Sequence, residues 1–303
     1  MAPRRGARLH PARHCAGADR HHHGRAAPGT RSGSRTMRPF LSPGRALRGG
    51  ATALAFLLIL APILVVVVAA FSPTDYFEFP PPGLSLRWFF EFFRLDNMRG
   101  AFVLSLELAL LSATIATMLG TLGALFLARR HGMIAGLLQS LFLAPLVFPT
   151  IILGLALLLL YKTVGMPVFP GLLLAHCVIG MPYCFRTVLA SAQALDPSLE
   201  EAGQSLGAGP ASTLFLITLP LIWQGVLSGW LFAFVVSFGE LNTALFLSGP
   251  GLTTLPIEIF SYLQFQGSQL VIAAASTLQI ALIIVMVAGI ERVVGLGRII
   301  RSR

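Results

Sequence analysis

The strongest constraint on this chain is a series of six long apolar stretches, each about as long as one crossing of a lipid bilayer. Charged residues make up 11% of the 303 residues and hydrophobic residues 55%, so the chain has too little polar surface to cover a soluble globule. A backbone in lipid must satisfy its own hydrogen bonds, and the stretches are therefore expected to be helices. We predict an all-α integral membrane protein with six transmembrane helices, at 51–71, 100–128, 133–161, 170–194, 221–246 and 270–294.

The net charge of +10 is concentrated before the first span. Residues 1–36 contain eight arginines and one acid, Asp19, which leaves seven of the ten charges there. This segment has no apolar period, so we expect a disordered basic tail rather than a nucleic-acid-binding domain. Either the tail is genuine or translation starts at Met37, before a leader over 37–50. The run His21–His23 has no further ligands at a useful spacing, and no metal or cofactor is expected.

Arginine placement predicts the orientation of the spans. Cytoplasmic loops carry an excess of Lys and Arg near the span ends. The leader, the connection after the second span and the segment 296–303 all contain arginines, and six spans place all three on one side. Both termini are therefore expected to be cytoplasmic, with the domain 51–295 in the membrane and 296–303 as a basic tail.

A polar segment over 196–220, between the fourth and fifth spans, is called the coupling segment below. Asp196 followed by Pro197 is a helix-start signal. Gly207 can adopt the positive φ that ends a helix, and Gly209–Pro210 opens a second one. We therefore predict a short cytoplasmic coupling helix, a sharp bend and another helix. The alternative is an ordinary acidic loop with a capped helix.

The residue types in the coupling segment are those of a docking surface. Two carboxylates offer charges to a basic partner, two small residues allow a close approach, and two apolar residues offer a grip before a proline that is expected to delay the next span. In that order they are Glu200 and Glu201, Ala202 and Gly203, Ile217 and Leu219, and Pro220.

The spacing from Glu201 through Gly207 to Pro220 resembles the EAA loop of ATP-binding-cassette importer permeases. Residues 40–295 look like the spermidine/putrescine group of these permeases. The matching runs are Phe79–Trp88, Ser237–Leu241 and Ser248–Pro256. Two positions depart from the pattern: Gly203 replaces an alanine, and Gly239 replaces an acid, which puts a strongly cationic substrate in doubt.

The resemblance implies a permease subunit of the bacterial inner membrane that forms half of a translocation pathway. Its implied partners are ATPase subunits that bind the coupling segment, a second permease subunit and a periplasmic binding protein. A polyamine is the favoured substrate. Another small organic cation, an amino-acid derivative or a ferric ion is the alternative.

Glu240 and Asn242 are candidates for the translocation pathway, since charges at membrane depth face protein or water. With Thr243 they are expected to form a polar stripe on the fifth span. The structural alternative for Glu240 is a carboxyl that is hydrogen-bonded within the bundle. Glu107 in the second span is expected to be structural.

The first external loop contains Trp88 among several phenylalanines. We expect a short helix there, with Trp88 as an anchor in the lipid headgroup zone. A docking surface for an external partner is the alternative.

Rival functions lack their signatures in the sequence. The single lysine, Lys162, is not preceded by the glycines of a P-loop, so the chain is not expected to hydrolyse ATP. His131 lies beside Arg129 and Arg130, and His176 has no carboxylate within helical reach, so an enzyme is not expected. An ion-gradient-driven secondary transporter is the second alternative, although paired acids or an internal repeat are not evident.

Overall fold

The computed structural model describes residues 43–265 and 267–294, in which the regular secondary structure is helical apart from an isolated bridge between Gly249 and Leu252. The predicted tails 1–36 and 296–303 and the run His21–His23 lie outside these residues.

Contacts divide the chain into two units, Met1–Ala53 and Leu54–Arg303. In the first unit the described residues 43–53 begin helix α1 (Pro43–Ala69), where the Thr52 hydroxyl donates to the Arg48 carbonyl over 2.9 Å. The helix therefore starts inside the predicted leader.

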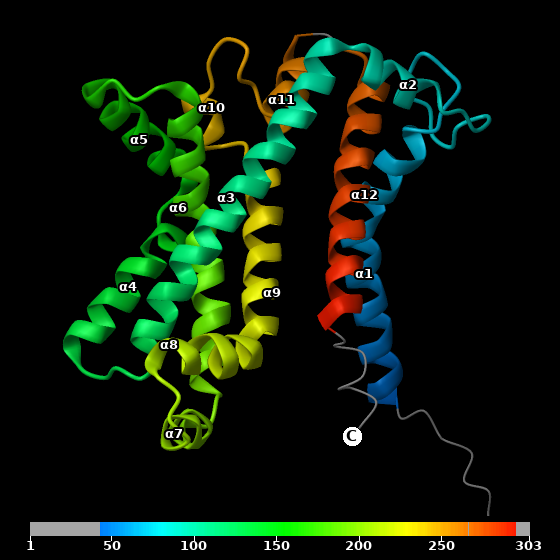
Figure 1. Cartoon of the computed structure of the whole chain (residues 1–303). Helices are drawn as coiled ribbons and strands as arrows, with labels where there is room; N and C mark the ends of the chain where they lie inside the picture. Colours follow the sequence, from blue (N-terminus) through cyan, green and yellow to red (C-terminus); the bar gives the residue numbers. More distant parts are fainter. Residues whose placement is uncertain (1–42, 266, 295–303) are drawn as a thin grey trace, which may run out of the picture. The chain divides into compact units, whose positions relative to one another are not determined.

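The second unit contains the rest of α1 and the other helices (Figure 1). In chain order these are α2 (Arg87–Arg94), α3 (Asp96–Ala128), α4 (Met133–Val147), α5 (Thr150–Val164), α6 (Val168–Gln193), α7 (Pro197–Ser205), α8 (Pro210–Thr213), the π-helical turn η1 (Leu214–Thr218), α9 (Leu219–Phe238), α10 (Ala244–Leu247), α11 (Leu255–Gln264) and α12 (Gln269–Val294).

Within the described part of the chain, five helices are long and apolar enough to cross a membrane, and the pair α4 and α5 makes a sixth if it counts as one span. The prediction of one continuous third span was wrong, because α4 and α5 meet at a bend of 103°. Phe148 is extended, with φ −80° and ψ 135°. Pro149 follows it, lacks an N–H and disfavours a helical residue before it, which explains the break.

Helices α3, α6 and α9 pack side by side at the centre of the second unit (Figure 1). Small residues allow this approach: a Cβ placed on Gly120 of α3 would lie 2.9 Å from the Cβ of Cys184 on α6. Ala113 and Ala116 of α3 are fully buried in the same interface. The small-residue face of the second span thus gives close helix packing.

The same three helices share a buried polar chain. The Ser112 hydroxyl lies 2.9 Å from that of Ser237, which lies 2.7 Å from Nδ1 of His176. This chain fixes the rotational setting of α3, α6 and α9, because hydroxyl and imidazole groups in an apolar interior need partners.

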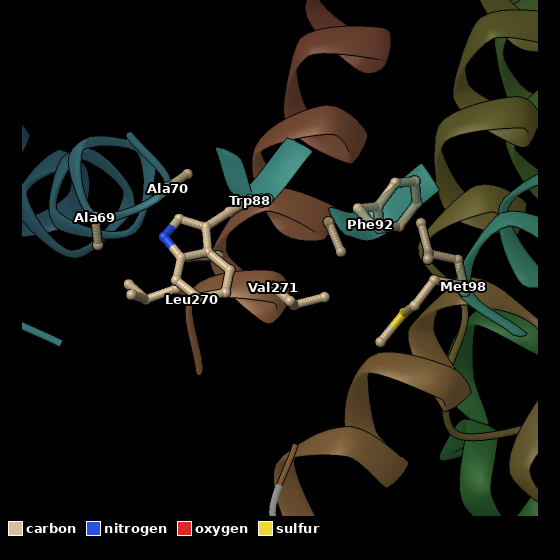
Figure 2. Packing of buried hydrophobic residues seen from close by; sticks show 11 residues of the cluster. Ala69, Ala70, Trp88, Phe92, Met98, Leu270 and Val271 are labelled. Carbon is tan, nitrogen blue, oxygen red and sulfur yellow. The ribbon is translucent and has the colours of Figure 1, made fainter. Parts of the chain in front are cut away.

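The short helix expected after the first span is α2, but Trp88 is not a lipid anchor. Trp88 is only 5% exposed and packs with Phe92 against Leu270 and Val271 of α12 (Figure 2). Its indole N–H donates to the Ser72 carbonyl over 2.9 Å. Trp88 therefore joins the loop to the helical bundle, and the indole satisfies its donor inside the protein.

The fifth span differs from its predicted bounds at both ends. The chain is helical from Pro210 to Phe238, so Pro220 does not delay the span as predicted. The turn η1 comes just before Pro220, and the Leu219 N–H donates to the Leu214 carbonyl five residues back. The wider π turn makes room for a proline ring that would clash with a carbonyl in a regular α-helix.

Candidate coupling site

The coupling segment lies at one end of the bundle, opposite α10 and α11 (Figure 1). Helix α7 starts where the sequence predicts, because the Asp196 carboxylate accepts the Ser198 N–H over 2.9 Å and Pro197 occupies the first turn. Hydrogen bonds from Ser198 hold the pKa of Asp196 below its ordinary value, and the charge of Arg129 lowers it further. The N-cap is therefore ionised at neutral pH.

Gly207 forms the predicted bend after α7. Its φ is +92°, in the left-handed region that a glycine adopts without a Cβ penalty. The Gly207 N–H donates to the Gln204 carbonyl, and the next N–H reaches back to Gly203. These bonds satisfy carbonyls at the end of α7 and turn the chain towards α8.

Glu200 is used inside the protein and not left free for a partner as predicted. Its Oε2 lies 3.0 Å from Nη2 of Arg129 at the end of α3. Its Oε1 accepts a hydrogen bond from the Thr218 hydroxyl over 2.8 Å. One carboxylate thus links α7 to the ends of two spans. Arg129 and Thr218 were not identified from the sequence as site residues, because no local pattern signals partners that lie 71 and 18 positions from Glu200.

Gly203 faces its own chain. A Cβ placed there would clash with Cδ1 of Ile217 in η1. The structure thus pairs Gly203 with Ile217, whereas both were expected to face a partner. Leu219 also packs inwards, among the partly buried residues around Phe185 and Ile222.

The exposed surface of the coupling segment combines two carboxylates, Asp196 and Glu201, with a large apolar part. Glu201, Ala202 and Pro220 are exposed and accessible to a partner. Sequence reasoning missed a larger apolar part: Leu206 is 91% exposed and Leu216 is 75% exposed. The presence of leucines in an otherwise polar segment could have indicated this apolar part.

A cleft of about 290 Å³ lies between α7 and the end of the bundle. Its polar wall includes Arg129, Glu200 and Gln204, and its apolar wall includes Leu125 and Leu195. The ion pair between Arg129 and Glu200 thus forms part of the wall of this cleft.

The two pathway candidates lie beyond α9. The prediction of a polar stripe on this helix was wrong, because α9 ends at Phe238, before the polar residues of that stripe begin. Glu240 is 9% exposed, and its Oε1 accepts the Thr243 N–H just before α10 over 2.8 Å. Asn242 is exposed, and its amide donates to the Thr150 hydroxyl over 3.1 Å. Both residues therefore lie in a break that joins the fifth span to the start of α5.

Glu107 is exposed on α3. Within residues 43–265 and 267–294, no group of three or more His, Cys, Asp or Glu residues is placed to hold a metal ion.

Known proteins match this chain along most of its length. It is 41% identical over 217 residues to the putrescine transport system permease protein PotI of Escherichia coli K12, a match that covers 69% of this chain and 76% of PotI. It is 28% identical over 246 residues to the spermidine/putrescine transport system permease protein PotC of the same strain, covering 81% and 93% of the two chains.

The fold also matches a solved structure. A chain of a bacterial ABC transporter involved in the import of the acidic polysaccharide alginate superposes with a TM-score of 0.62 at 14% identity, covering 84% of this chain and 99% of that one. Residues 116–295 match the family described as binding-protein-dependent transport system inner membrane component. The chain belongs to this family and is a permease subunit of an ATP-binding-cassette importer.

Proposed function

We propose that this subunit forms half of the pathway by which a putrescine-like polyamine enters a bacterial cell. The observation that carries the proposal is the 41% identity over 217 residues to a putrescine permease. The alternatives are another small organic cation, an amino-acid derivative or a ferric ion. The replacement of an acid by Gly239 favours a substrate of modest positive charge.

ATPase subunits bind the coupling segment in this proposal. The exposed side chains of Glu201, Leu206 and Leu216 give such a partner one charge and an apolar patch to grip. The positive φ of Gly207 forms the bend between α7 and α8. When the ATPase moves α7, the contacts of Glu200 with Arg129 and Thr218 carry the movement to the ends of α3 and α9.

The remaining partners are a second permease subunit and a periplasmic binding protein that delivers the substrate. The arginine distribution supports cytoplasmic termini, which would place α7 on the ATPase side of the membrane. The subunit itself catalyses no reaction in this proposal, since its only lysine lies outside any P-loop pattern.

Glu240 and Asn242 are proposed to contact the passing substrate. Their support is a position in a non-helical break, with Asn242 exposed and the second carboxylate oxygen of Glu240 outside the Thr243 bond. Non-helical backbone at membrane depth is tolerated where it lies in protein or lines a water-filled cavity.

Reconstitution tests the proposal. Proteoliposomes would contain this chain with its ATPase and second permease subunits, and would receive the binding protein and radiolabelled putrescine. We expect uptake that requires hydrolysable ATP. Equal uptake by this chain alone under an ion gradient would overturn ATP coupling and favour a secondary transporter. ATP-dependent uptake of ferric ion or an amino-acid derivative in preference to putrescine would overturn the substrate class alone.

A further inference from the structure

Two adjacent arginines at the turn between α3 and α4 have different surroundings. Arg129 is turned to Glu200 of the coupling segment, at 3.0 Å. The guanidinium of Arg130 lies over the Phe126 ring, 4.0 Å from its centroid. In the described part of the chain, no carboxylate lies within salt-bridge distance of Arg130. Its charge is therefore available to an external anion.

Arg130 lines a cleft of about 400 Å³ between the end of α3 and the start of α4. His131 adds a second nitrogen-bearing side chain, whose ring N–H is a hydrogen-bond donor in either neutral tautomer. The other lining residues are apolar: Phe126, Leu127, Ile134, Ala135 and Leu138. The cleft thus combines hydrogen-bond donors at one side with an apolar wall.

The first turn of α4 adds to the positive potential of this cleft. The helix begins after Gly132, and no side chain caps its first N–H groups. Ala135, in that turn, is part of the lining. Free N–H groups and the helix dipole favour an anion here, next to the Arg130 charge.

An apolar track leads away from the cleft along α4. Ile134, Leu137 and Leu141 follow one another at helical spacing and are 77%, 69% and 67% exposed. Met133, at the start of the helix, is 93% exposed. A soluble anion has no use for such a track, whereas the acyl chain of a lipid would cover it.

We propose that the cleft between α3 and α4 binds the headgroup of an anionic phospholipid, with one acyl chain along α4. The phosphate would accept hydrogen bonds from Arg130, His131 and the first turn of α4, and the acyl chain would cover Ile134 and Leu137. Basic pockets at the cytoplasmic ends of transmembrane helices suit such headgroups. The site goes beyond the transport function, and only its assignment to the inner leaflet rests on the proposed orientation.

Native mass spectrometry of the purified full chain in detergent tests the site with dioleoyl phosphatidylglycerol as the probe. We expect one retained lipid per chain, and a loss of about tenfold in retention for Arg130→Gln, as removal of one charge-assisted contact predicts. Arg129→Gln removes the neighbouring charge on the coupling side and is expected to retain lipid as the unchanged chain does. Arg130→Lys is expected to retain an intermediate amount, which separates loss of the site from misfolding.

Three results would overturn the proposal. Equal retention in Arg130→Gln and the unchanged chain would mean that the cleft is not the site. Equal retention of dioleoyl phosphatidylcholine would mean ordinary lipid contact without selection for negative charge. Displacement of the lipid by glycerol phosphate at a similar concentration would point to a soluble anion. None of these measurements uses transport, so their outcome is independent of the uptake experiment.

Discussion

The contact between Arg129 and Glu200 gives the sharpest test of how α7 is tied to the spans. We predict that Arg129→Gln lowers the number of substrate molecules carried per ATP hydrolysed. The two side chains are 39% and 21% exposed, with 3.0 Å between nitrogen and oxygen. A charge-assisted hydrogen bond contributes about 1.5–3 kcal/mol, and solvent screening at the more exposed arginine reduces this to about 1 kcal/mol.

A loss of about 1 kcal/mol changes the equilibrium between docked and displaced α7 by a factor of about 5. Because the Thr218 hydroxyl still donates to Glu200, α7 is expected to be loosened and not released. The consequence is a ratio of transport to hydrolysis that falls by a factor of about 2 to 5, while assembly with the ATPase continues.

Proteoliposomes containing the complete transporter provide the assay, with radiolabelled putrescine uptake and phosphate release measured on the same sample. Arg99→Gln is the matched control, because it removes an exposed pair with Asp96 at the opposite end of α3. The charge-swapped pair, Arg129→Glu with Glu200→Arg, should recover part of the ratio, although it loses the Thr218 acceptor. An unchanged ratio in Arg129→Gln would refute the reasoning.

Three further substitutions test separate parts of the structure. Gly207→Trp should leave membrane insertion intact but abolish ATP-dependent uptake and weaken ATPase binding in a pull-down, because a bulky residue is strained at φ +92°; normal uptake would contradict the coupling role. Glu240→Gln should raise the KM for putrescine more than it reduces assembly, since the amide oxygen can still accept the Thr243 N–H; unchanged kinetics would make Glu240 structural. Gly120→Leu should lower the thermal unfolding temperature in detergent, because even a Cβ would lie 2.9 Å from that of Cys184, and overpacking costs about 1–3 kcal/mol; an unchanged temperature would mean that α3 and α6 can separate freely.

Local chemistry is the part of this fold that can be predicted from the sequence. The spans follow from apolar runs, and α7 follows from Asp196, Pro197 and Gly207, each of which acts on its own few neighbours. The predicted fold class is confirmed by the helical structure and its likeness to a chain of a solved ABC transporter. Pro149 is also a local signal, since a proline disfavours a helical residue before it, and it could have predicted the break in the third span.

The missed features depend on residues that are distant in the sequence. Glu200 looked free because Arg129 lies 71 positions earlier. Trp88 resembled a lipid anchor because the Ser72 carbonyl and α12, which bury it, leave no trace in the local pattern. The coupling and pathway roles of individual residues stay predictions, since they concern contacts with other molecules.

The π turn before Pro220 sets the rotational phase of α9. One residue corresponds to about 100° of rotation in an α-helix, so the extra residue accommodated in this turn determines which side chains on either side of it share a face. Thr218 lies at the end of the turn and faces Glu200. Shortening the segment 214–218 by one residue would turn the membrane-embedded part of α9 by about a quarter of a revolution relative to the coupling helix, without changing the polarity of either part.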